Sequence, residues 1–178
     1  MRRPTAACAR IGCTSAWAQA GAGPYGGPAG ICSRPAPGLG PGRQALLIGS
    51  HLDSVRHGGR YDGAYGTIAG LLVAAACRGG AGLPVVGFVT CEEEDSRFHG
   101  GMMGGRSLLG RVEAGELDSV ADRDGVTWRQ ALAAAREQGC AAPLGAAGTG
   151  SAPLFTPALE LELHIEQGPV LEAQHLGL

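Results

Sequence analysis

From residue 43 onward, apolar residues gather into short runs that are separated by polar and glycine-rich stretches. Residues 45–48 (ALLI) form one run that ends at Gly49 and Ser50, and residues 84–91 (PVVGFVTC) form a second run rich in β-branched side chains. Short, bounded apolar runs of this kind are typical of buried strands. Residues 159–163 alternate leucine and glutamate, which predicts a third strand with one polar face.

Helices are predicted between these strands. Residues 67–78 are apolar nearly all round, as in a buried helix, and residues 106–112 predict a short helix. Thr127, with Gln130 three residues later, forms a capping box that begins a helix running to about Gln138. Strands that alternate with helices predict an α/β fold, a three-layer sandwich around a largely parallel central sheet.

Residues 1–42 have a different composition, dominated by alanine, glycine and proline, with no helical or strand periodicity. We expect a disordered leader, or one read in the wrong frame. It contains a G-x-G-x-x-G pattern at Gly21, Gly23 and Gly26, but Pro24 lies inside the pattern and no strand or helix pattern flanks it. A dinucleotide-binding site is therefore rejected.

Composition and charge exclude several classes of protein. Hydrophobic residues make up 44% of the chain, enough for a core, and the net charge of −2 gives no electrostatic case for binding nucleic acid. No apolar run is long enough for a membrane span, and no apolar stretch follows the basic start, so we expect a cytoplasmic protein. No two of the six cysteines have C-x-x-C spacing, which argues against a thiolate zinc site; Cys77 and Cys91 are predicted to be small buried hydrophobes.

Three polar clusters follow the three predicted strands: GSHLDS with GGRYDG at residues 49–63, EEEDSRF at 92–98 and HIEQG at 164–168. In an α/β sheet, sites form at the carboxyl ends of the strands. Alone, each cluster has an ordinary explanation, because a histidine after a strand is often a hydrogen-bonded structural residue and an acidic run is often a solvated loop. Together, two histidines and several carboxylates suit a divalent ion with nitrogen and oxygen ligands.

The blocks GSHLDSV, GGRYDGAYG, EEEDSRF and ELHIEQGPVLE resemble, in this order, the signature blocks of binuclear-metal amidohydrolases in the aminoacylase/carboxypeptidase superfamily. The similar branch contains allantoate amidohydrolase, N-carbamoyl-L-amino-acid hydrolase and β-ureidopropionase. The intervening DRDGVTWRQAL resembles the same branch, so the resemblance covers residues 43–178. It implies a catalytic domain of the phosphorylase/hydrolase-like zinc-peptidase type.

The resemblance also implies a set of metal ligands: His51, Asp62, Glu94 and His164. Asp62 would bridge two divalent ions, Zn²⁺ or Mn²⁺, with the two histidines on the first ion and Glu94 on the second. Asp53 would orient His51, Glu93 would be the general base, and Gln167 would lie near the substrate. Such a carboxylate takes a proton from water and passes it to the leaving nitrogen. Asp95 stands where many relatives have glycine.

The resemblance predicts that residues 43–178 are an incomplete catalytic domain, because the chain stops after the third block. The lid domain, through which the family forms homodimers, and a further metal-binding histidine would lie beyond it. We therefore expect at most one tightly held ion and weak activity. The leading hypothesis is hydrolysis of C–N bonds in ureido or linear amide substrates, nearer to allantoate than to N-carbamoyl amino acids. A non-catalytic metal-binding remnant stays open as the alternative.

Overall fold

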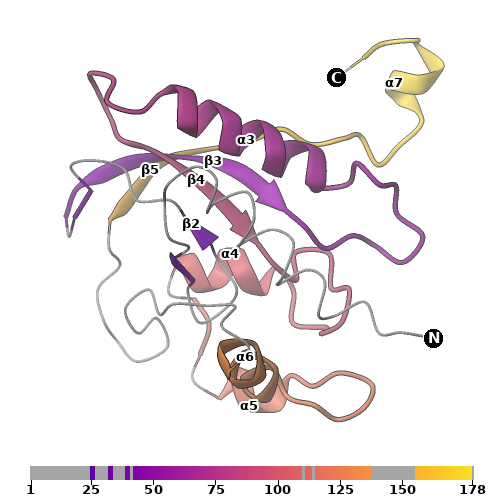
Figure 1. The fold of residues 1–178 in the computed structure, drawn as a ribbon. Helices are drawn as coiled ribbons and strands as arrows, with labels where there is room; N and C mark the ends of the chain where they lie inside the picture. The colour runs from indigo at the N-terminus through magenta and orange to yellow at the C-terminus, as the bar shows by residue number, and fades with distance from the viewer. Residues whose placement is uncertain are drawn as a thin grey trace.

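The computed structural model describes residues 25–26, 32–33, 39–40, 42–109, 111–113, 115–137 and 155–177. Its centre is a sheet with the strand order β1-β2-β4-β3-β5 (Figure 1). The strands are β1 (Tyr25–Gly26), β2 (Cys32–Ser33), β3 (Gln44–His51), β4 (Val85–Thr90) and β5 (Thr156–Glu162). The predicted leader falls largely outside the described residues, but the sequence pattern gave no sign of β1 and β2 within it.

The three long strands are parallel, and their register sets the geometry of the site. β3 lies in the middle, with β4 on one side and β5 on the other. Leu46 is paired with Val85 on β4 and with Leu159 on β5, while His51 is paired with Thr90. The three strands therefore end at the same edge of the sheet. This confirms the predicted α/β fold with a largely parallel sheet; the short β2 is antiparallel to β4.

The helices are α3 (Ala64–Ala76), α4 (Met103–Leu108), α5 (Glu116–Ser119), α6 (Trp128–Glu137) and α7 (Val170–Ala173). The capping box of α6 is confirmed, since Thr127 N–H donates to Gln130 Oε1 and Gln130 N–H donates to Thr127 Oγ1. The predicted short helix at 106–112 is wrong in its bounds, because α4 begins three residues earlier and ends at Leu108. The helices α5 and α7 are too short to show a periodic pattern and were not predicted.

Helix α3 lies against one face of β3 and β4, and glycines bring it close (Figure 1). A Cβ built at Gly70 would lie 2.6 Å from the Gly49 Cα, and one built at Gly66 would overlap the Leu163 carbonyl oxygen. Only residues without a side chain allow the backbones to approach to this distance. On the opposite face of the sheet, a hydrophobic core is formed by Ala45, Leu47, Val86, Phe88 and Phe155. Helix α4 lies on that side of the sheet.

Two predictions about burial are wrong. Residues 67–78 were expected to form a helix buried all round, but Ile68 is 59% exposed and Leu72 is 67% exposed. A helix packed on a single sheet buries one stripe, and no second element covers the outer stripe among the described residues. Cys77 is exposed for the same reason, at the end of the helix. On the edge strand β5, the apolar Leu159 is exposed as well as the polar face.

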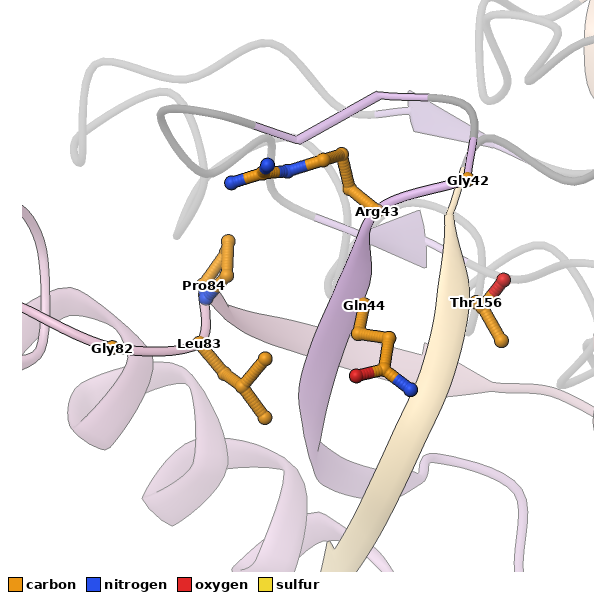
Figure 2. A pocket seen from close by; sticks show the side chains of 7 residues that line it. All are labelled: Gly42, Arg43, Gln44, Gly82, Leu83, Pro84 and Thr156. Carbon is orange, nitrogen blue, oxygen red and sulfur yellow. The ribbon is translucent and has the colours of Figure 1, made fainter.

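A hollow lies at the amino ends of β3, β4 and β5 (Figure 2). It has a volume of about 520 Å³ and is lined by Gly42, Arg43, Gln44, Gly82, Leu83, Pro84 and Thr156. It is open, and Arg43 is the one ionisable residue in its lining. Within the described residues, no helix has the length and apolar character that crossing a membrane requires.

Candidate metal centre

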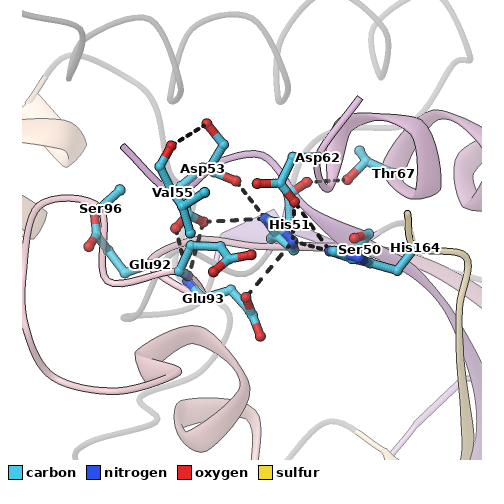
Figure 3. Close-up of polar contacts among 12 residues, drawn as sticks. Ser50, His51, Asp53, Val55, Asp62, Thr67, Glu92, Glu93, Ser96 and His164 are labelled. Atoms are coloured by element: carbon cyan, nitrogen blue, oxygen red, sulfur yellow. Dashed lines mark hydrogen bonds and ion pairs between the residues drawn. The ribbon is translucent and has the colours of Figure 1, made fainter. Parts of the chain in front are cut away.

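The predicted ligands lie together at the carboxyl edge of the sheet, and each comes from a different segment; Figure 3 labels three of them, His51, Asp62 and His164. His51 is the last residue of β3, Asp62 lies in the turn before α3, Glu94 follows β4 and His164 follows β5. One ligand atom from each of the four residues lies within 4.8 Å of every other. The structure therefore brings together all four residues that the sequence singled out as ligands.

Both imidazoles are held by backbone carbonyls on the side away from the centre. His51 Nδ1 lies 2.6 Å from the Asp53 carbonyl oxygen, and His164 Nδ1 lies 2.8 Å from the Ile165 carbonyl oxygen. A carbonyl only accepts, so each Nδ1 carries a proton, and each Nε2 faces the centre, where an unprotonated nitrogen presents a lone pair. These two Nε2 atoms are 2.8 Å apart. Two lone pairs this close repel each other unless a proton or a cation lies between them, which is the arrangement of metal-binding histidines.

Asp62 contributes a carboxylate beside the two imidazoles. Its Oδ1 lies 3.4 Å from His164 Nε2 and 3.7 Å from His51 Nε2, and the residue is only 3% exposed. Its Oδ2 is buried and has no hydrogen-bond partner among the described residues. A buried carboxylate oxygen without a partner costs free energy, so the site calls for a positively charged partner.

Glu94 and Gln167 form the open side of the centre. The Gln167 amide donates from Nε2 to Glu94 Oε1 at 2.6 Å and to Asp62 Oδ1 at 3.1 Å. Gln167 thus bridges two of the carboxylates, and its predicted place near the substrate stays a prediction. Two imidazole nitrogens and two carboxylates are a donor set that fits a divalent ion of the zinc or manganese type.

Asp53 supports the centre in a way that differs from the prediction. Its carboxylate was expected to orient His51, but its Oδ1 lies 4.0 Å from His51 Nδ1, and the carbonyl of the same residue makes the close contact. The carboxylate instead accepts the backbone N–H groups of Glu93 and Glu94, at 3.2 and 3.0 Å. Asp53 therefore connects the histidine to the acidic loop.

Glu93 lies beside the ligands without joining the group of four. Its Oε2 is 3.8 Å from His51 Nε2, and its side chain is partly exposed. Burial raises the pKa of Glu93, and the charges of Glu94, Glu162 and Asp53 raise it further, while His51 opposes the change. A carboxylate whose pKa is raised accepts a proton more readily, as a general base must.

Asp95 occupies a left-handed backbone conformation, with φ of 52°. Glycine adopts this conformation without strain, and aspartate is among the few other residues that tolerate it. The Asp95 carboxylate also accepts the Gly101 N–H at 2.8 Å, a contact that glycine cannot make. The departure from the glycine of many relatives is therefore accommodated locally.

Three supporting residues were missed by the sequence analysis. The Thr67 hydroxyl donates to the His51 carbonyl at 2.9 Å, and Ser50 donates to the Glu162 carboxylate, which fixes β5 beside β3. Glu92 is buried, and burial raises the pKa of its carboxyl group. For Ser50 and Glu92 the one sequence signal was a polar residue next to the end of a predicted strand, a pattern that surface loops share, and Thr67 lies within α3.

Known proteins resemble this chain in both sequence and structure. An N-carbamoyl-L-amino-acid amidohydrolase of Paenarthrobacter aurescens is 40% identical over 144 residues, covering 79% of this chain and 34% of the relative. An allantoate amidohydrolase of Bacillus subtilis is 33% identical over 132 residues, covering 72% of this chain and 30% of the relative. No protein-family model matches the chain.

A solved hydantoinase/carbamoylase family amidase from Burkholderia ambifaria superposes with a TM-score of 0.66 at 30% identity. The superposition covers 97% of this chain and 46% of that protein. The resemblance to the amidohydrolases is confirmed. The chain spans about a third of the length of the curated relatives that it matches.

Proposed function

We propose that this chain carries the metal site of a hydrolase that cleaves C–N bonds in ureido or linear amide substrates. The observation that carries the proposal is the convergence of Nε2 of His51 and Nε2 of His164 on Oδ1 of the buried Asp62, whose Oδ2 has no hydrogen-bond partner among the described residues. His51, Asp62, Glu94 and His164 would hold the ion. When bound, a divalent ion lowers the pKa of its water and polarises a substrate carbonyl.

The remaining residues supply proton transfer and substrate contact. Glu93 takes a proton from the attacking water, because its carboxylate stands beside the ligands and its pKa is raised. It then gives that proton to the leaving nitrogen, so that a terminal ureido group releases ammonia and the resulting carbamate loses carbon dioxide. Gln167, on the open side, offers an amide to polar groups of the substrate.

Two substrate classes have specific support. The triple-glutamate block CEEEDSRF favours an allantoate-type substrate, whereas the 40% identity to an N-carbamoyl-L-amino-acid amidohydrolase favours N-carbamoyl amino acids. Both substrates present a terminal ureido group. Ammonia release from allantoate, compared with release from an N-carbamoyl-L-amino acid, separates the two.

Paired variants of the acidic loop test the proposal. Glu93→Gln keeps an oxygen of the same size but cannot accept the proton, so the bound ion should stay and ammonia release should fall by about 10²–10⁴-fold. Glu94→Gln removes a charged ligand, so metal content after dialysis should fall as well. Swapped results would show that the two roles are reversed. A wild-type protein that retains metal but releases no ammonia would support the non-catalytic metal-binding alternative.

A further inference from the structure

The acidic loop that follows β4 begins at Glu92, a residue with no part in the metal group described above. Glu92 has a left-handed backbone, with φ of 53°, and is 9% exposed. A glutamate in this conformation is under local strain, which persists only where surrounding contacts hold it. The next two residues along the chain are Glu93 and Glu94. The conformation of Glu92 therefore sets the direction in which both acids leave the strand.

The Glu92 carboxylate is turned inward and closes the loop on itself (Figure 3). Its Oε2 accepts the backbone N–H groups of Arg97 and Phe98 at 3.0 and 2.9 Å. Its Oε1 accepts the Ser96 hydroxyl at 3.2 Å. The Glu92 side chain thereby holds residues 96–98, at the far end of the loop, close to Glu92.

Both ends of this closed loop are fixed to the rest of the fold. Phe98 is buried and meets the Trp128 ring edge-on at 4.7 Å between centroids. The Met103 N–H donates to the Glu92 carbonyl at 3.2 Å, which joins the loop to the start of α4. On the side of the metal group, the Asp53 carboxylate holds the amides of Glu93 and Glu94.

We propose that Glu92 is a positioning residue, whose carboxylate closes the loop over Ser96, Arg97 and Phe98 and so aims Glu94 at the ion and Glu93 at the water. The inference rests on the proposed function for what the two acids do. The loop closure itself rests only on the hydrogen bonds of Glu92. Without the carboxylate, the Arg97 and Phe98 amides lose their acceptor. The backbone that leads into Glu94 is then no longer held in one conformation.

The contacts of Glu92 require an acceptor and not a negative charge. In Glu92→Gln, the amide oxygen can take the place of Oε2 and receive both backbone amides, while the amide nitrogen donates to the Ser96 hydroxyl. In Glu92→Ala, both amides are left without a partner. A positioning role predicts that glutamine restores what alanine removes, whereas a role in proton transfer or metal ligation predicts that glutamine fails.

The test measures Co²⁺ binding to the chain by the visible absorption of the bound ion, together with amide hydrogen exchange. Glu92→Ala should weaken Co²⁺ binding by about 10–100-fold, the usual effect of losing a residue that orients a ligand. Glu92→Gln should stay within about threefold of wild type. The control is Val86→Ala, which shortens a buried β4 side chain in the separate core cluster with Leu47 and Phe88.

Hydrogen exchange separates this inference from the proposed function. The Arg97 and Phe98 amides should exchange at least tenfold faster in Glu92→Ala than in Glu92→Gln or Val86→Ala, with or without metal. Unchanged exchange, or Co²⁺ affinity that falls equally in Glu92→Ala and Val86→Ala, would overturn the positioning role. Absence of Co²⁺ binding by wild type, with the exchange pattern intact, would overturn the metal site and leave the loop closure standing.

Discussion

The two ends of the parallel sheet differ in what they place together. The amino ends of β3, β4 and β5 surround an open cavity of about 520 Å³, in which Arg43 is the one ionisable group (Figure 2). The carboxyl ends bring together two histidines and two carboxylates whose ligand atoms lie within 4.8 Å of one another. The convergence of side chains that can bind a metal, and not the volume of a hollow, therefore distinguishes the carboxyl end of this sheet.

The difference has a physical origin in how the strands end. At the carboxyl edge, β3 ends in a buried histidine and the turns that follow return polar side chains over the strand ends. Burial removes these groups from water, so each needs a specific partner. At the amino edge, Gln44 and Thr156 are exposed and water satisfies them. We therefore expect substitutions at the carboxyl edge to change metal affinity and stability more than substitutions at the amino edge do.

The largest effect should come from Asp62→Asn, which preserves the shape of the side chain and removes its charge at the centre of the ligand group. We expect divalent-ion affinity to fall by more than about 100-fold, beyond the usual cost of losing a supporting contact. Titration calorimetry with Zn²⁺ measures it. The matched control is Asp118→Asn, the same change in an exposed carboxylate paired with Arg129. Equal affinities in the two variants would remove Asp62 from the site.

A pair of glycines gives the next largest contrast. Gly63 and Gly42 both have positive φ, of 63° and 74°, but a Cβ at Gly63 would overlap the His51 ring, whereas one at Gly42 meets nothing within 4 Å. Gly42→Ala should cost only the left-handed conformation, about 1–2 kcal/mol. Gly63→Ala adds steric overlap and should cost about 3 kcal/mol or more. Urea denaturation compares them, and similar costs would show that the ring has room to move.

A smaller effect should come from Glu160 on β5. The side chain of Glu160 is exposed at the edge of the sheet, but partial desolvation by its neighbours first, and then the charge of Glu162, raise the pKa of Glu160 above its ordinary 4.5. The folded state therefore disfavours the ionised form, and stability is lost as the pH rises through the raised pKa. Glu160→Gln should stabilise the chain at pH 7 by less than about 1 kcal/mol, and this gain should vanish below pH 4.5.

The opposite sign is expected for Glu116, which serves as the control for Glu160. The Glu113 backbone N–H and then Arg106 lower the pKa of Glu116, so its contribution to stability is present above pH 4.5 and is lost as the pH falls through the lowered value. Glu116→Gln should therefore destabilise the chain at pH 7. Melting temperatures of both variants, measured between pH 3 and pH 7, test the two opposite effects on stability. A higher melting temperature at pH 7 for both variants would contradict the lowered pKa of Glu116.

The smallest effect should be that of Arg43→Ala at the amino-end cavity. Arg43 is exposed and lies at the edge of the sheet far from the ligand group, so Zn²⁺ affinity should stay within about twofold of wild type. A large loss of affinity in the same calorimetric titration would mean that the two ends of the sheet are coupled. That result would contradict the conclusion that only the carboxyl end of the sheet contributes to metal binding.

The sequence predicted the strands well because their patterns are local. The apolar runs at 45–48 and 84–91 became β3 and β4 within a few residues, and the Thr127–Gln130 capping box marked the start of α6 correctly. Burial was predicted less well, since it depends on what packs against an element. Some apolar side chains of α3 face the sheet and others face away from it. The sequence pattern does not show which side of the helix will be covered by another element.

The site was predicted in part for a similar reason. His51, Asp62, Glu94 and His164 could be found because ligands follow strand ends and match known blocks. The hydrogen bonds that hold these residues in place could not be predicted from the sequence. That Asp53 uses its carbonyl for His51 and its carboxylate for the acidic loop depends on a backbone turn, and the residue type is the same in either arrangement.

We propose that the carboxyl ends of β3, β4 and β5 form one metal site. Anomalous diffraction from crystals of the chain grown with Zn²⁺ tests it most directly, because the scattering locates the ion independently of any activity. We predict a zinc peak about 2.0–2.1 Å from Nε2 of both His51 and His164, with Asp62 in the same coordination shell. A peak confined to the exposed His57 or His99, with none between His51 and His164, would contradict the account.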